Sequence, residues 1–484
     1  MSIFRRTLSL QTTIAIVIGG IIGSGIFMKP SVMAAQVGSP WLLLTVWVVA
    51  GIITLFGALS NAEVATMFPE TGGQFVFFQK MYGSFFSFIY GWAAFAVFNT
   101  AGNASIAYVC SEYANFFLHL PRFDAATEQS FYIPVPFIGK LYVLQNIGVK
   151  LLTIILILIF TFINCRSVQF GGAVQRLLTA LKLIAMGILI FGLLGSGKGS
   201  FSNFNQSLPV IPTGLALLSA FMAAVAGAFW AYEGWNNITF IAGEIKDPQK
   251  NIPKSLMSGL FACIIVYALT NVAFIYVLPV QDLSTSSFVA SDAASVAWGI
   301  IGGGLIALMV ILSTLGTTNA NVLATARVTY AWCADSRLFG SAGKAHSKFN
   351  TPSNALLLNA AWSCILILSG SFDMLTDMLI FVSWFFYMMS GIGLFVLRKK
   401  FRNAERPYKV IGYPVVPVIF ILFAAAYLVV TLYTDISNYV NGRSELINSV
   451  FGLLITIAGV PLYFYSKRKL NRERSVQVGD TTEA

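Results

Sequence analysis

Runs of predominantly apolar residues, each about as long as a membrane-crossing helix, recur along the whole 484-residue chain. A helix of about 20 apolar residues crosses a hydrocarbon core of about 30 Å. Only 10% of the residues are charged, against roughly 25% in soluble domains. A membrane β-barrel would instead show alternating segments of about 10 residues. The chain is therefore predicted to be an all-α, multi-pass integral membrane protein.

Twelve apolar spans are expected. They cover residues 10–36, 41–67, 85–117, 145–164, 168–195, 214–243, 255–279, 293–331, 354–370, 373–397, 415–434 and 446–466. The loops between them are too short for a separate domain, so residues 1–484 are predicted to form a single membrane domain. Residues 475–484 are expected to be a disordered tail.

The basic residues of the loops predict the orientation. Of the 30 Lys and Arg residues, six lie on one side of the predicted spans, one lies inside a span, and the other 23 lie on the opposite side with both termini. Cytoplasmic loops carry the excess of Lys and Arg. Both termini are therefore expected in the cytoplasm of a cell-membrane protein. Topology and attraction to anionic lipid explain the net charge of +11, so no nucleic-acid partner is predicted.

The first span contains "IGGIIGSGIFM" (18–28), which places four glycines in an apolar helix. One interpretation is close helix packing, because small residues let helix backbones approach. The other is a break at Gly23-Ser24-Gly25 that exposes backbone N–H and C=O groups. Such groups are costly in lipid, so a break is tolerated only around a cavity that satisfies them.

The sixth span carries a second interruption. It reads "FMAAVAGAFWAYEGWNNITFIAGE", with Glu233 and Gly234 at its centre. If residues 10–195 and 214–398 form two repeats of opposite topology, the two interruptions occupy matching places. Matched interruptions indicate the central site of a secondary transporter. The last two spans, 415–466, then follow as an addition to the repeats.

The two breaks also suggest the ligand. A half-helix starting near Ile26 offers unpaired N–H groups and a positive dipole end, which suit a carboxylate. Half-helices ending near Ile22 and Trp230 offer free carbonyls, which suit an ammonium group. Donors beside acceptors fit a zwitterion, so an α-amino acid is the predicted substrate.

At this point several stretches match a known family. They are "GGIIGSGIFMKP", "NAEVATMFPETGGQFVF", "VQRLLTALKLIAMGILI", "WAYEGWNNITFIAGEIKDPQKNIPKS", "ATARVTYAWCADSRLFG" and "NTPSNALLL", which occur in the family's order over most of the chain. The chain resembles the amino acid–polyamine–organocation transporters, and within them the bacterial-type members of the L-type amino acid transporter branch. The resemblance implies a LeuT-like inverted repeat of five plus five helices with two further C-terminal helices. It also implies sodium-independent transport of L-amino acids by alternating access, often by obligatory exchange.

The resemblance also implies where the substrate binds. Its carboxylate is expected on the backbone of Ser24 and Gly25, and its amine on carbonyls of Ile21, Trp230 and Glu233. Trp230 stands where the family usually has a phenylalanine gate, which leaves the size of that gate open. The full set of expected substrate-binding residues is Ile21, Ile22, Gly23, Ser24, Gly25, Trp230, Ala231, Glu233 and Asn236.

Lys182 lies within the fifth span, where a charge costs at least about 2.5–3.5 kcal/mol. One interpretation is a lysine that extends its stem to the membrane interface. The resemblance instead places its ammonium beside the first break, where sodium-driven relatives bind a cation. Ser313 and Thr317, on one face of the eighth span, are the expected acceptors. Lys182 is therefore predicted to replace sodium, and a role as proton carrier stays open.

The sequence also leaves alternatives to amino acid exchange. Proton-coupled symport is the main one, and Glu233 could either select cationic amino acids or form hydrogen bonds at the rim of the break. A channel is not predicted, because a channel does not need two matched helix breaks. An enzyme, a metal site or a cofactor is not predicted, because the chain has only two histidines and no "HExxH".

Animal relatives pair with a heavy chain through a loop cysteine, but residues 119–145 contain none, so no covalent partner is expected.

Overall fold

The computed structural model describes residues 6–166, 172–349 and 351–482. Residues 168–171, the start of the predicted fifth span, and residues 483–484 of the predicted tail lie outside this range. The helices are α1 (Leu10–Ile21), α2 (Gly25–Val37), α3 (Pro40–Met67), α4 (Gln74–Tyr82), α5 (Ser84–Ala93), the π-helix η1 (Ala94–Phe98), α6 (Asn99–Leu118), α7 (Ala125–Ser130), α8 (Ile147–Arg166), α9 (Gly172–Leu194), the 3₁₀ helix η2 (Phe201–Asn205), α10 (Gly214–Tyr232), α11 (Asn237–Phe240), the 3₁₀ helix η3 (Ala242–Glu244), α12 (Pro248–Val277), α13 (Val280–Thr285), α14 (Val289–Ser336), α15 (Ser353–Ser369), α16 (Phe372–Lys400), α17 (Val415–Val440), α18 (Asn448–Ile457) and α19 (Gly459–Thr482). Strands β1 (Tyr132–Val135) and β2 (Gly139–Tyr142) form an antiparallel hairpin.

The predicted membrane character is confirmed. Within the described residues, nine helices are long and apolar enough to cross a membrane, and the bent pair α1–α2 makes a tenth span if it counts as one. Two further apolar helices are shorter, at residues 179–194 and 353–369. They coincide with the fifth and ninth predicted spans, so the count of twelve remains a prediction.

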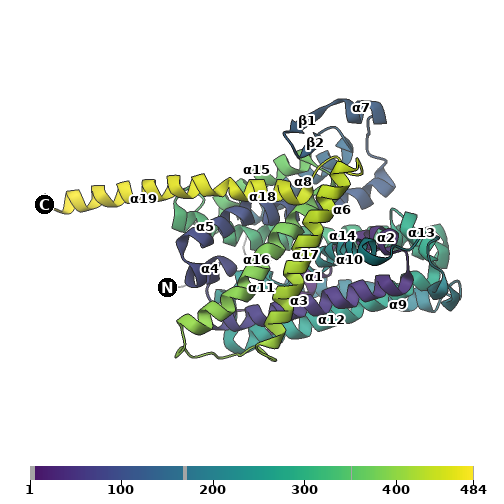
Figure 1. The fold of residues 1–484 in the computed structure, drawn as a ribbon, viewed down its shortest axis with the longest axis horizontal. Coiled ribbons are helices and arrows are strands. Elements are labelled where there is room, and N and C mark those ends of the chain that lie inside the picture. Colours follow the sequence, from purple (N-terminus) through teal and green to yellow (C-terminus); the bar gives the residue numbers. More distant parts are fainter. Residues whose placement is uncertain (1–5, 167–171, 350, 483–484) are drawn as a thin grey trace.

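Some predicted boundaries differ from the structure. The backbone is non-helical at Gly299, where φ is 74° and ψ is −174°, so the long helix α14 is kinked within the predicted span 293–331. The helix α19 continues to Thr482, through residues for which the sequence predicts a disordered tail. In Figure 1 this helix projects from the left side of the bundle.

The broken helices lie inside the bundle. Helix α12 packs along α3 and α1, α14 packs along α6, and α10 packs along α2. Both ends of the chain lie on the left of Figure 1, whereas α13 lies on the right and α7 with the hairpin lies at the upper right. The face with α13, α7 and the hairpin is therefore remote from the termini.

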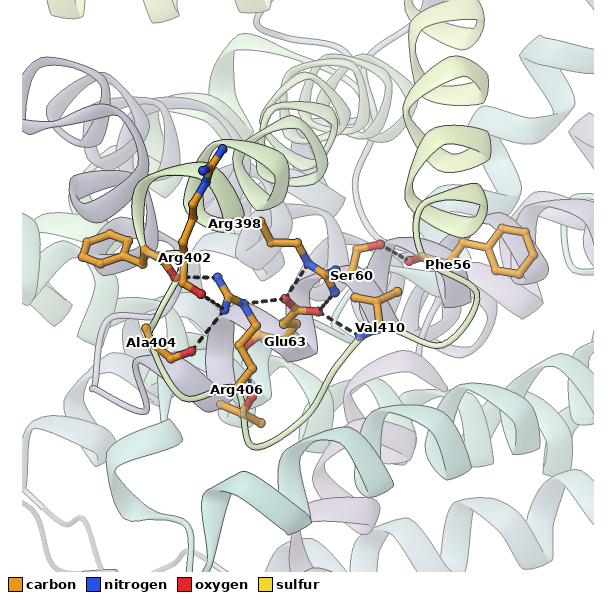
Figure 2. Close-up of polar contacts among 10 residues, drawn as sticks. Phe56, Ser60, Glu63, Arg398, Arg402, Ala404, Arg406 and Val410 are labelled. Atoms are coloured by element: carbon orange, nitrogen blue, oxygen red, sulfur yellow. Dashed lines mark hydrogen bonds and ion pairs between the residues drawn. The ribbon is translucent and has the colours of Figure 1, made fainter.

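A buried ion-pair cluster fastens the linker between α16 and α17 to the end of α3. The Glu63 carboxylate, completely buried, accepts bonds from Arg398 at 2.9 and 2.6 Å and lies 3.4 Å from Arg406. It also accepts the backbone N–H of Val410 at 2.8 Å. Figure 2 shows Arg398, in the last turn of α16, and Arg406, in the linker, on either side of this carboxylate.

Candidate functional site

The first predicted break is confirmed. Helix α1 ends at Ile21, α2 begins at Gly25, and the two axes are bent by 41°. Ile22 is extended, with φ −71° and ψ 94°. Because Gly25 starts a helix, the amide groups of its first turn have no partner within that helix. The segment 22–24 thus leaves the helical hydrogen-bond pattern in the middle of the bundle, where the Ile22 carbonyl accepts from Lys182 and the Ser24 carbonyl accepts the N–H groups of Phe27 and Met28.

The second predicted break is confirmed as well. Helix α10 ends at Tyr232, Glu233 is extended with φ −62° and ψ 148°, and Gly234 has a φ of 107°. Such a positive φ strains any residue with a Cβ atom, so glycine is required at this turn. The chain resumes helical geometry only at Asn237.

The two breaks pack directly against each other. A Cβ atom on Gly25 would lie 2.4 Å from the Cα of Ala231, and one on Gly234 would lie 2.5 Å from the carbonyl oxygen of Gly20. Side chains would therefore push the broken spans apart. The two interpretations of the glycine-rich stretch are compatible, since some of its glycines permit close packing while the backbone beside them is unwound.

Tyr267 of α12 joins the breaks, and the sequence analysis missed it. Its hydroxyl lies 2.8 Å from the Ile21 carbonyl oxygen and 2.9 Å from that of Ala231, so its single hydrogen is shared between these two acceptors. These carbonyls belong to the last residues of α1 and α10, which have lost their helical partners. The side chain is completely buried. A tyrosine in an apolar span carries no pattern that points to such a contact, because the contact depends on packing between distant helices.

Lys182 of α9 contacts the first break, as the resemblance implied. Its Nζ atom donates to the Gly19 and Ile22 carbonyls, each at 3.3 Å, and to the Thr317 hydroxyl of α14. The side chain is only 7% exposed. Ser313, the other expected acceptor, contributes through its carbonyl, which accepts the Thr317 hydroxyl at 3.0 Å. A single ammonium group thus connects α9, the broken span and α14.

A cavity of about 40 Å³ lies between the breaks. This is room for about three waters at about 10–15 Å³ each, so the space between the breaks is small. Its lining combines both breaks with side chains of α6, α14 and α16: Gly20, Ile21, Gly23, Ser24, Gly25, Phe98, Asn99, Gly102, Ile106, Trp230, Glu233, Gly234, Asn237, Thr317, Asn321 and Leu379.

A chain of amide side chains forms one wall of this cavity. Asn237 donates to Asn321 at 3.1 Å, and Asn321 donates to Asn103 at 2.8 Å. Asn99 also lines the cavity, and its amide nitrogen is buried without a partner. The sequence analysis missed these residues, although Asn99 and Asn103 lie four apart in an apolar span. That spacing puts two amides on one helix face and marks a functional position in a membrane helix.

Some expected substrate residues lie beside the cavity rather than in its lining. The Asn236 side chain accepts from Asn61 at 2.8 Å, and its neighbour Asn237 takes the place in the lining. Ala231 packs on Gly25, and the Ile22 carbonyl is bound by Lys182. Asn236 and Asn237 are consecutive residues at the start of α11, so their side chains point to different sides of that helix. The substrate contacts of Ile22, Ala231 and Asn236 remain predictions.

The Glu233 side chain connects the second break to α16. Its Oε1 atom accepts the Tyr387 hydroxyl at 2.5 Å. Because the carboxylate already has this partner, it is held at the side of the cavity rather than free within it. Its own backbone N–H donates to the Trp230 carbonyl at 3.1 Å, so that carbonyl, an expected amine ligand, has one bond already.

Aromatic and ionic contacts cover the cavity on the side of α13 and the hairpin. Trp230, 5% exposed, lies edge-on to Phe372 with ring centroids 6.0 Å apart. The ammonium of Lys29, on α2, is 4.7 Å from the Phe372 ring and 2.8 Å from the Asp373 carboxylate. The expected gate residue Trp230 is therefore packed under an ion pair that joins α2 to α16.

Contacts on the side of the termini cover the opposite end. The Glu244 carbonyl accepts the backbone N–H groups of Thr7 and Leu8 at 2.9 and 3.0 Å, and its carboxylate pairs with Arg327 at 3.0 Å. These bonds hold the start of the chain and the segment after α11 against α14. In the part of the chain that the structure describes, no group of three or more His, Cys, Asp or Glu could hold a metal ion.

Comparisons with known proteins show what the chain is similar to. The sequence profile of the amino acid permease family matches residues 8–459. The serine/threonine exchanger SteT of Bacillus subtilis is 30% identical, over 96% of this chain and 98% of its own length. The human large neutral amino acids transporter small subunit 2 is 30% identical over 95% of this chain and 80% of its own, and the human cystine/glutamate transporter is 28% identical over 95% and 85%.

Proposed function

Because the chain belongs to the amino acid permease family, we propose that it is a sodium-independent exchanger of L-α-amino acids that works by alternating access. The observation that carries this proposal is the meeting of two helix breaks at one small cavity. The start of α2 supplies amide donors and a positive dipole end for the substrate carboxylate. Carbonyls at the ends of α1 and α10 supply acceptors for its ammonium group.

In this proposal Lys182 does the work of a bound cation. Its ammonium bonds carbonyls of the first break and the Thr317 hydroxyl, which are oxygen acceptors of the kind that bind sodium. A fixed lysine makes an external sodium ion unnecessary. Spans 1–5 and 6–10 would form the inverted repeats, both termini would be cytoplasmic, and the chain would act without a covalent heavy chain.

The size of the cavity supports a small substrate. About 40 Å³ beside Trp230 holds only about three waters, so the cavity must widen for any amino acid, and a small one requires the least widening. The name of SteT, a serine/threonine exchanger, agrees with small polar amino acids. We therefore infer that serine, threonine and alanine are better substrates than large neutral amino acids.

Uptake of labelled L-serine into proteoliposomes tests the function. Vesicles preloaded with unlabelled serine should take up label at least ten times faster than empty vesicles, with or without sodium. Proton-coupled symport would instead give uptake into empty vesicles that depends on an imposed proton gradient. Failure to transport any of a panel of L-amino acids, by protein that binds none of them, would overturn the proposal.

A further inference from the structure

A second, larger cavity lies under the β-hairpin. It measures about 440 Å³ and is bounded by α7, the hairpin, the start of α16 and the segment that leads into α18. We call it the hairpin cavity. Figure 1 shows α7 and the hairpin, which supply part of its lining, on the face remote from the termini, so in the proposed orientation the cavity is on the outer face of the membrane.

The walls of the hairpin cavity are fastened to one another. The segment before α18 pairs with the hairpin, since Lys140 donates its N–H to the Glu445 carbonyl at 2.9 Å and Ile447 donates to that of Ile138 at 3.0 Å. Arg122 binds Glu128 through two bonds of 3.0 Å each. The hydrogen bonds from Arg122 hold the pKa of Glu128 below its ordinary value. The charges of Arg122 and Glu128 therefore cancel each other, and their two bonds stabilise this wall of the hairpin cavity.

Charges of both signs remain for a ligand. Lys140 contributes an ammonium group, 4.6 Å from the Tyr132 ring and without a carboxylate partner among the ion pairs of the described residues. Glu445 and Asp373 contribute carboxylates, and the Asp373 side chain is 61% exposed. The Ser444 hydroxyl is buried at the cavity without a partner. Two carboxylates and one ammonium group complement a zwitterion, and they disfavour a molecule with a second negative charge.

Asp373 connects the hairpin cavity to the central one. Its Oδ1 atom binds Lys29 of α2, which also donates to Thr376 at 3.0 Å. Lys29 and Trp230 both contact the ring of Phe372. An ammonium group that binds Asp373 from the hairpin cavity competes with Lys29, which lies four residues after the first helical residue of α2.

We propose that the hairpin cavity is a second amino-acid site, in which the substrate carboxylate binds Lys140 and its ammonium binds Asp373 and Glu445. Occupancy draws Asp373 from Lys29, so that α2 and Trp230 are released and the central cavity opens on this face. The inference rests on the proposed function, since it assigns a further site to the same substrate.

Exchange measured separately from each face tests this site. In proteoliposomes with one orientation, Lys140→Glu should raise the half-saturation concentration of L-serine on the hairpin face about tenfold, and on the opposite face leave it at the wild-type value. Arg443→Glu is the matched control, because Arg443 is an exposed cation on the same face that does not line the cavity. It should change neither concentration. Lys140→Arg should restore the wild-type value on the hairpin face.

Equilibrium binding in nanodiscs supplies a second measurement. Wild-type protein should bind two molecules of labelled L-serine and Lys140→Glu one, with L-glutamate the weakest competitor for the site that is lost. One molecule bound by both proteins would overturn the second site, as would equal effects of Lys140→Glu on the two faces. If the wild type does not exchange L-serine, the proposed function fails. The second site is still tested in that case, because binding of two serine molecules by the wild type and one by Lys140→Glu would support it without any transport.

Discussion

The two helix breaks are built alike but held differently. The first, at residues 22–24, is held by an ammonium group, since Lys182 bonds the Gly19 and Ile22 carbonyls and Thr317. The second, at residues 233–236, is held by two hydrogen bonds in which no cation takes part. Tyr387 donates to Glu233, and Asn61 donates to Asn236. Tyr267 bonds both.

This difference assigns the breaks different parts in transport. The charged hydrogen bonds of one lysine hold the first break, and loss of this lysine leaves several buried acceptors without a donor. Hydrogen bonds between uncharged hydroxyl and amide groups are weaker than hydrogen bonds from an ammonium group. We infer that the first break is the switched element, because one ammonium group holds it and can release all of its acceptors in a single movement. The backbone of the second break, at residues 233–236, is the frame against which it moves, and of α10 only the Trp230 side chain moves with the gate.

Loss of the lysine should have the largest effect. Lys182→Ala leaves buried acceptors unsatisfied at about 1–3 kcal/mol each, so exchange of L-serine should fall by at least about tenfold. Initial rates in preloaded proteoliposomes measure this. Lys198→Ala removes an exposed loop lysine and should transport like the wild type. Wild-type rates for Lys182→Ala would end the assignment of Lys182 as the cation of the first break.

The packing of the breaks can be tested by one methyl group. Gly25→Ala places a Cβ atom 2.4 Å from the Cα of Ala231, a contact that the rigid backbone of α10 cannot relieve. Overpacking costs about 1–3 kcal/mol, so both the melting temperature in detergent and the exchange rate should drop. Gly187→Ala is the control, because its new methyl group meets nothing within 4 Å. Equal behaviour of the two variants would show that the breaks are not in close contact.

The shared hydroxyl should matter less than the lysine. Tyr267→Phe removes one donor from two carbonyls, which costs about 1–3 kcal/mol if no water replaces it. We expect a several-fold slower exchange with unchanged protein yield. Tyr90→Phe serves as the comparison, because the Tyr90 hydroxyl is buried without a partner, and its removal should be neutral. If Tyr267→Phe transports as fast as Tyr90→Phe, the bridge between the breaks has no function.

Much of this site could be predicted from local sequence. Four glycines in an apolar run and a glutamate in mid-span indicated both breaks, and Lys182 was conspicuous as a charge within a span. Tyr267 and the chain of Asn237, Asn321 and Asn103 were not predicted, because their contacts join helices far apart in the sequence. The choice between Asn236 and Asn237 as a lining residue depended on which side of α11 faces the cavity, which the sequence does not specify.

The smallest effect is expected at the second break itself. Glu233→Gln keeps an oxygen that accepts the Tyr387 hydroxyl, and it removes only the charge. If the second break is a frame, exchange of L-serine should stay within about twofold of the wild type, and inhibition by L-arginine should not change. Competition assays with L-arginine and L-alanine measure both. A loss of arginine inhibition with alanine inhibition intact would instead make Glu233 a carboxylate that selects cationic substrates, and the second break would then take part in recognition.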